Sequence, residues 1–279
     1  MTTTRPGPTG TAAVPASGPG PLVALGHTWL LTARALRAIW RMPMYMVMNL
    51  VQPMFWLLLF GALFRSVVEI PGFGTGGTYL EFITPGIVMM TAMFGAAWAG
   101  TTFVQDMERG VMDRFLTSPT SRGALMVASM LCQAVIALGQ TVVVLGVAWL
   151  CGARFDGGLS GVALLAVGVV LLTAVFSALS NAFALITAQQ EALIGLSQLI
   201  TLPLMFISSA IMDPRLSPAW VATVARFNPF DWAVRLGRAA LDGSAPASEI
   251  WGPLALLATA TVLMAWVATR AFRARERSA

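Results

Sequence analysis

Six long stretches of this chain contain no aspartate, glutamate, lysine, arginine or histidine. They cover residues 43–64, 82–104, 124–151, 159–187, 192–212 and 250–269. A helix needs about 20 predominantly apolar residues to cross the hydrocarbon core of a bilayer. Runs of this length therefore predict an all-α membrane protein with six transmembrane helices.

The composition supports a membrane environment. Hydrophobic residues make up 57% of the chain and charged residues only 10%, whereas a soluble fold of this size needs far more charge to cover its surface. The pI near 10.5 does not indicate nucleic-acid binding, because basic residues at the ends of membrane spans are the commoner cause in such a protein.

The segments outside the spans suggest four further parts. Residues 1–21 are rich in Pro, Gly, Thr and Ala and predict a disordered tail. Residues 22–42 set tryptophans on one helical face and arginines on the opposite face, which predicts an amphipathic helix in the headgroup layer. Residues 43–270 form the transmembrane domain, and residues 271–279 form a cytoplasmic tail.

The distribution of arginine predicts the orientation. If both termini are cytoplasmic, eleven arginines lie inside and six outside. Cytoplasmic loops carry the excess of positive charge in membrane proteins. Both termini are therefore expected in the cytoplasm.

The connection before the last span is long and partly apolar. Within residues 213–249, VATVARF and NPFDWAVRLGRAAL read as helices too short to cross a membrane. Pro218 and Pro229 suit helix starts, and Asp231 and Arg235 are spaced to pair across one turn. Two short helices that re-enter the outer leaflet fit this pattern.

The stretch DMERGVMDRFLTSPTSRG, residues 106–123, concentrates charge between two apolar runs. Its apolar residues share one helical face and its charges lie on the other sides. Asp106 is placed to begin this helix and Pro119 to end it. Two interpretations remain open from the pattern alone, a solvated interfacial turn or a helix that docks on a cytoplasmic partner.

Four blocks carry a resemblance to a known family. They are RMPMYMVMNLVQPMFWLLLFGALF (41–64), YLEFITPGIVMMTAMFGAAW (79–98), ERGVMDRFLTSPTSRGAL (108–125) and NPFDWAVRLGRAALDG (228–243). In this order they resemble permeases of the ABC-2 family, in particular daunorubicin/doxorubicin resistance exporter permeases. The resemblance extends over about residues 22–270.

The resemblance implies a six-span permease that exports hydrophobic drugs and works as a homodimer with two copies of a separate ATPase. It also implies a coupling helix that contacts this ATPase, and a re-entrant motif. The coupling residues would be Glu108, Arg109, Gly110, Asp113, Arg114, Phe115, Pro119 and Arg122. The re-entrant motif would include Asn228, Pro229 and Arg238.

The absence of lysine bears on the ATPase. A P-loop needs the lysine of G-x-x-x-x-G-K-[ST] to reach the nucleotide phosphates, and all 17 basic residues here are arginine. If transport is driven by ATP, the nucleotide and Mg²⁺ must therefore bind to another chain. We expect no catalytic residue, metal site or cofactor on this one.

Other function classes fit the sequence less well. A proton-coupled antiporter usually places an ionisable group inside the membrane, and the six predicted spans contain no acidic or basic residue. A membrane enzyme would need a convergent set of polar residues. A closer alternative is an ABC-2 exporter of a lipid-linked or polysaccharide precursor.

Few polar side chains are available to line a transport pathway. Asn49, Gln52 and Asn181 are the candidates for a cavity between two protomers, although amides in membrane helices more often bond neighbouring helices. An uncharged lining rich in Met and Phe suits flat hydrophobic molecules.

Overall fold

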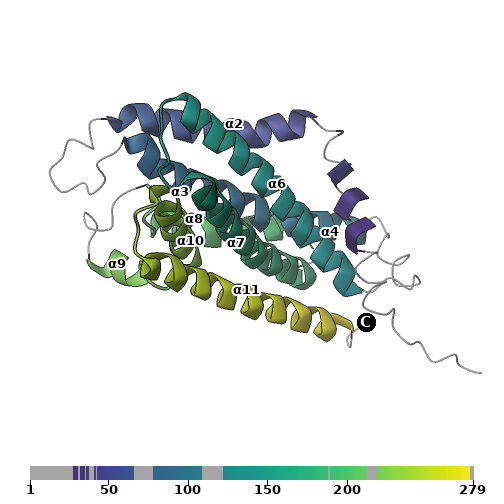
Figure 1. Cartoon of the computed structure of the whole chain (residues 1–279). Coiled ribbons are helices and arrows are strands. Elements are labelled where there is room, and N and C mark those ends of the chain that lie inside the picture. Colours follow the sequence, from purple (N-terminus) through teal and green to yellow (C-terminus); the bar gives the residue numbers. More distant parts are fainter. Residues whose placement is uncertain are drawn as a thin grey trace, which may run out of the picture.

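The computed structural model describes residues 43–65, 78–108, 122–187, 189–211 and 219–276, with a few positions between 28 and 41. The described residues form helices and no strand. Figure 1 shows them: α2 (Pro43–Leu63), α3 (Tyr79–Ala97), α4 (Ala99–Glu108), α6 (Arg122–Leu150), α7 (Gly158–Thr187), α8 (Gln190–Phe206), α9 (Ala219–Ala225), α10 (Pro229–Asp242) and α11 (Ala247–Glu276).

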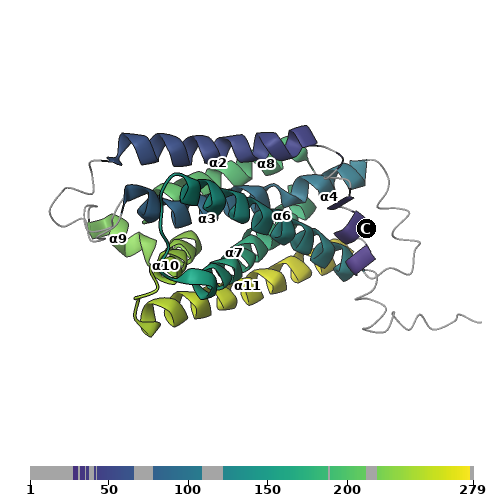
Figure 2. The ribbon, with the colours of Figure 1, turned by 45° about the horizontal axis from the view of Figure 1, so that its top comes forward.

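The long helices run along one another in a single bundle (Figures 1 and 2). α9 and α10 lie at one end of the bundle, and α4 lies at the other, toward the C-terminal end of α11. The two short helices and α4 therefore belong to opposite ends of the molecule.

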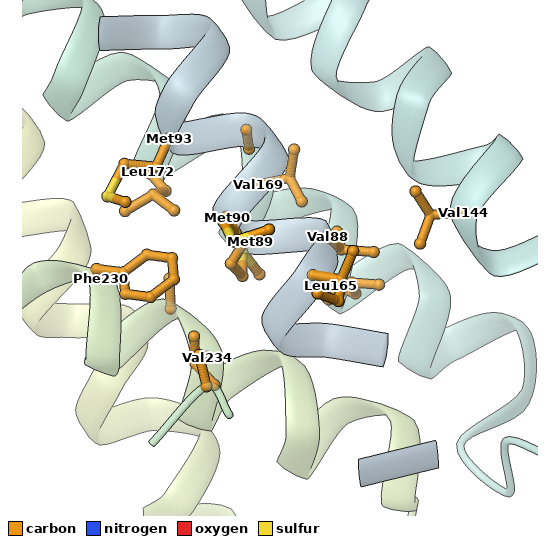
Figure 3. Packing of buried hydrophobic residues seen from close by; sticks show 14 of the residues in the cluster. Val88, Met89, Met90, Met93, Val144, Leu165, Val169, Leu172, Phe230 and Val234 are labelled. Atoms are coloured by element: carbon orange, nitrogen blue, oxygen red, sulfur yellow. The ribbon is translucent and has the colours of Figure 1, made fainter. Parts of the chain in front are cut away.

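The core of the bundle forms around α3, which packs against α6, α7 and α10. Every residue from Phe82 to Met90 is buried, as expected of a helix that is apolar on all sides. Figure 3 shows how the α3 side chains meet those of the three neighbours. The labelled residues are Val88, Met89, Met90, Met93, Val144, Leu165, Val169, Leu172, Phe230 and Val234.

Four described stretches are long and apolar enough to cross a membrane. They are Tyr79–Thr102, Val127–Leu150, Gly158–Thr187 and Ala247–Arg270, and the two helices Val47–Leu63 and Gln190–Phe206 are apolar but shorter. The helical class of the chain is thus confirmed, and each of the six predicted spans overlaps at least one helix of the structure. That all six cross the membrane stays a prediction.

Two predicted boundaries need correction. The second span is not one helix over 82–104, because helical geometry is interrupted at Trp98, between α3 and α4. The fifth span is not helical over the whole of 192–212, because α8 ends at Phe206 and residues 207–211 are not helical. The predicted sixth span, 250–269, lies within α11, which continues to Glu276, and a cytoplasmic location for residues 271–279 stays a prediction. A hydropathy pattern predicts neither the interruption at Trp98 nor the end of α8 at Phe206, because it reports apolar content and not backbone geometry.

The predicted short helices are present as α9 and α10. Pro229 occupies the first turn of α10, where its missing N–H costs nothing. Arg235 Nε lies 2.9 Å from Asp231 Oδ2, so the predicted pair across one turn is formed. Whether these helices re-enter the membrane stays a prediction.

At the N-terminal side, the described positions between 28 and 37 are helical. Trp29 is exposed, and the Thr32 hydroxyl group lies 3.4 Å from the carbonyl oxygen of Ala128 in α6. The headgroup location of residues 22–42 stays a prediction, and residues 1–21 lie outside the described residues.

Candidate functional site

The candidate site lies where α8 ends against α10. Helix α8 ends at Phe206, and the chain continues without helical geometry over residues 207–211, which we call the kinked segment. The last carbonyl groups of a helix lack partners within the helix and must find others when they are buried. Most of the partners come from α10.

Asn228 serves both helices at once. Its Oδ1 accepts a hydrogen bond from the N–H of Phe230 at 2.9 Å and so caps α10. Its Nδ2 donates to the carbonyl oxygens of Leu204 and Ile207 at 2.6 and 2.7 Å. The residue is 2% exposed, so this one amide replaces water for the end of α8 and the start of α10.

Asp231 and Arg238 hold Ser209, at the centre of the kinked segment, from both sides. The Ser209 N–H donates to Asp231 Oδ1 at 2.8 Å, and its carbonyl oxygen accepts from Arg238 Nη2 at 2.9 Å. Asp231 is buried, and its second oxygen is bound by Arg235. Both carboxylate oxygens are therefore compensated, as a buried charge requires.

Arg238 also connects α10 to α3. The same Nη2 atom lies 3.3 Å from the carbonyl oxygen of Phe82, and the guanidinium carbon lies 3.8 Å from the centre of the Phe82 ring. A guanidinium stacked on an aromatic face is a favourable cation–π arrangement. The contacts of Arg238 are thus with the backbone and with a ring of this chain, which makes it an anchor of α10.

We call Asn228, Asp231 and Arg238 the α10 clamp. Its contacts are hydrogen bonds to the backbone, the ion pair between Asp231 and Arg235, and the stacking of Arg238 on the Phe82 ring. Among the described residues no three histidine, cysteine, aspartate or glutamate side chains are grouped to hold a metal. What the arrangement can do is fix the kinked segment between α3 and α10. The Tyr79 hydroxyl group adds a bond to the carbonyl oxygen of Ile211 at 2.9 Å.

Sequence reasoning identified Asn228, Pro229 and Arg238 but missed what they bind. It also missed Tyr79 and the second contact of Asp231. Tyr79 is the first residue of α3 and Asp231 lies in the first turn of α10, where polar residues are common at helix starts. Nothing in the local pattern shows partners that lie more than 20 residues away along the chain.

The predicted pathway residues lie on two different helices. Asn49 is half-buried and Gln52 exposed on α2, whereas Asn181 is completely buried on α7. Neither polar atom of the Asn181 amide has a hydrogen-bond partner among the described residues, and the same holds for the hydroxyl groups of Thr173 and Ser177. These three residues are four apart and share one face of α7.

Most predicted coupling residues lie outside the described residues. These are Arg109, Gly110, Asp113, Arg114, Phe115 and Pro119. Glu108 is the last residue of α4 and Arg122 the first of α6, so the backbone at both ends of the segment is helical. Asp106 does not begin a helix, because α4 runs from Ala99 to Glu108.

Comparison with known proteins adds the family context. The sequence profile of the family described as "ABC-2 type transporter" matches residues 26–241. A daunorubicin resistance ABC transporter permease of Streptomyces coeruleorubidus is 29% identical over 266 residues, covering 93% of this chain and 89% of the relative. A putative transport permease of Porphyra purpurea is 28% identical over 73% of this chain and 70% of its own length.

A more distant similarity concerns a probable doxorubicin resistance ABC transporter permease of Mycobacterium tuberculosis. It is 25% identical to this chain, over 63% of the chain and 62% of its own length. The matched family region contains the α10 clamp, the kinked segment and α3.

Proposed function

The chain belongs to the ABC-2 type transporter family, and from this premise we propose that it is the permease subunit of an ATP-binding cassette exporter for hydrophobic drugs or antibiotics. The observation that carries the proposal is the match to a drug-resistance permease over 93% of the chain, combined with a bundle of apolar helices long enough for a membrane. We further propose a bacterial plasma membrane location, six spans and cytoplasmic termini.

The energy source in this proposal is a separate ATPase subunit. The chain contains no lysine with which to build a P-loop. Two copies of the ATPase would bind ATP and Mg²⁺, and two copies of the permease would form the pathway. The residues proposed to contact the ATPase are those of the coupling segment between α4 and α6.

The proposed cargo is small and hydrophobic. Large apolar side chains are exposed along α2 and α11, where a bilayer or a second protomer would cover them. A strongly anionic sugar chain finds no cationic side chain in the six apolar runs. This favours drugs over polysaccharide precursors.

The test is efflux of a fluorescent anthracycline from bacteria under three conditions. Cells express this chain alone, with the ATPase encoded beside it, or with that ATPase carrying a mutated P-loop lysine. We expect efflux only with the intact ATPase. Efflux from the chain alone would replace the proposal with an ion-coupled carrier, and no efflux despite co-purification of the two proteins would discard the drug cargo.

Reversing the charge of the coupling segment is expected to weaken ATPase docking. In Glu108→Arg or Arg114→Glu, an interface charge loses its partner and meets a like charge. We expect at least about tenfold less ATPase to co-purify with an unchanged amount of membrane-inserted permease. The matched control is Asp156→Arg, which reverses an exposed charge in the α6–α7 connection. Equal co-purification of all variants would remove the docking role.

Asn181→Leu is expected to raise stability and lower transport. An unsatisfied buried amide costs about 1–3 kcal/mol, so a leucine of similar volume should raise the thermal unfolding midpoint by a few degrees. If Asn181 binds cargo in another conformation, efflux falls at the same time. Gln189→Leu is the control, because this amide is exposed, makes no cap hydrogen bond and is not among the proposed pathway residues. A lower midpoint for Asn181→Leu would show that the amide has structural partners.

A further inference from the structure

The interruption between α3 and α4 leaves backbone groups to be satisfied inside the bundle. α3 ends at Ala97, Trp98 has φ −99° and ψ 3°, and α4 begins at Ala99. An unpaired carbonyl or N–H group buried in an apolar environment costs free energy comparable to a lost hydrogen bond. The buried carbonyl and N–H groups at the break therefore need hydrogen-bond partners from neighbouring helices.

Two buried serines supply them. The Ser180 hydroxyl group of α7 donates to the carbonyl oxygen of Ala97 at 2.6 Å and accepts from the Gly100 N–H at 3.0 Å. The Ser197 hydroxyl group of α8 donates to the same carbonyl oxygen at 3.0 Å. Ser180 is 2% and Ser197 5% exposed. The Ala97 carbonyl group before the break and the Gly100 N–H after it are thus both bonded to α7. The Ala97 carbonyl group is also bonded to α8.

Beyond the break, α4 packs against α7 and α8 more than against α3. Gly100 permits the closest approach, since a Cβ at this position would lie 2.5 Å from the backbone oxygen of Ser180. If α4 moved, it would therefore displace α7 and α8 more directly than α3, although α4 is covalently joined to α3. Its other end, Glu108, leads into the proposed coupling segment.

A small cavity of about 10 Å³ lies beside the break. Its lining includes Ala97, Phe176, Ser180, Ser197 and Thr201. Drug-sized ligands need about 300–1,000 Å³, so this space does not hold cargo. It is close to the least volume that admits one water molecule. A water there would be a substitute partner for the Ala97 carbonyl group whenever a serine bond opens.

We propose that Ser180 and Ser197 are positioning residues for energy coupling. They hold a joint at Trp98 where α4 pivots relative to α3 and passes movement of the coupling segment to α7 and α8. Such a joint requires three features. The backbone groups at the break need alternative hydrogen-bond partners, α4 must pack on the helices that it moves, and there must be free space beside the break. The structure supplies two hydroxyl donors for one carbonyl oxygen, the packing of α4 on α7 and α8, and the cavity beside Ala97. The inference rests on the proposed ATP-driven function for its direction of movement, but the joint itself can be tested without it.

The first test is hydrogen exchange of backbone amides in the purified full-length permease, using Ser180→Ala, Ser197→Ala and the double variant. The control is Ser177→Ala, which removes a hydroxyl group from a buried serine of α7 that has no hydrogen-bond partner among the described residues. We expect exchange in α4 to accelerate about fivefold per lost bond, with no change in α10. Unchanged exchange in α4, or equal acceleration in both helices, would overturn the joint.

The second test uses the reconstituted complex with its ATPase and measures transported anthracycline per ATP hydrolysed. A purely structural defect lowers both rates together. If the joint is lost in the alanine variants, ATP hydrolysis should stay within about twofold of the wild type, and the anthracycline transported per ATP should fall at least about fivefold. Ser197→Thr retains the hydroxyl group and should keep the wild-type ratio. An unchanged ratio in the double variant overturns the coupling role. A wild-type complex that neither hydrolyses ATP nor transports contradicts the proposed function instead, and hydrogen exchange then decides on the joint.

Discussion

Asn228→Ala is expected to lower the free energy of unfolding by about 3–5 kcal/mol. The variant loses the cap of α10, worth about 1 kcal/mol, and removes the donors for two carbonyl groups. A buried carbonyl left without a donor costs about 1–3 kcal/mol, and we expect about 1–2 kcal/mol for each of these two because Leu204 and Ile207 are half-buried. In a chain of this size such a loss lowers the midpoint of thermal unfolding by about 10 °C, which is measurable on detergent-solubilised protein.

Asn228→Asp separates the two roles of the side chain. An aspartate keeps an oxygen that accepts from the Phe230 N–H, but it places a second acceptor where Nδ2 now donates to Leu204 and Ile207. The cap survives and the link to α8 does not. We therefore expect aspartate to be at least as destabilising as alanine. A midpoint close to that of the wild type would mean that capping alone explains Asn228.

The α10 clamp changes how the family resemblance is interpreted. The block NPFDWAVRLGRAALDG carries part of that resemblance, and Asn228, Asp231 and Arg238 within it all bind backbone atoms of the kinked segment. These residues maintain the architecture at the end of α8. Similarity in this block therefore indicates a shared permease fold and says nothing about which molecule is transported.

The sequence predicted local features of this fold better than its long-range contacts. Apolar content located the helices, and the spacing of Asp231 and Arg235 located their pair, because such signals lie within one turn or one span. The sequence did not predict the break at Trp98, because residues 82–104 contain no charged residue and read as one continuous span. Its hydrogen bonds come from Ser180 and Ser197, at least 80 residues farther along the chain.

For the candidate site, too, the sequence indicated individual residues, and their long-range contacts came from the structure. Asn228, Pro229 and Arg238 were selected from the sequence, and the structure adds their partners. Asn181 was selected as a pathway residue, which stays a prediction, and because its side chain is completely buried a cargo would contact it only if the helices rearranged. The coupling residues from Arg109 to Pro119 remain predictions, since they lie outside the described residues.

Gly86→Ala is expected to destabilise the protein by about 3 kcal/mol, although Gly to Ala within a helix normally stabilises by about 0.5–1 kcal/mol. A Cβ on Gly86 would lie 2.6 Å from the carbonyl oxygen of Ala210, and 3.1 and 3.2 Å from its Cα and carbonyl carbon. All three are backbone atoms, so no side-chain rotation relieves the overlap. α3 and the kinked segment must separate instead.

Gly95→Ala is the matched control, because it lies in the same helix and a Cβ there meets no atom within 4 Å. We expect its unfolding midpoint to equal or exceed that of the wild type. Gly86 and Asn228 restrain the same kinked segment from α3 and α10, so their substitutions should not add. Once one substitution has released the segment, the second has less to disrupt. A double variant whose loss equals the sum of the two single losses would show that the two helices hold the segment independently.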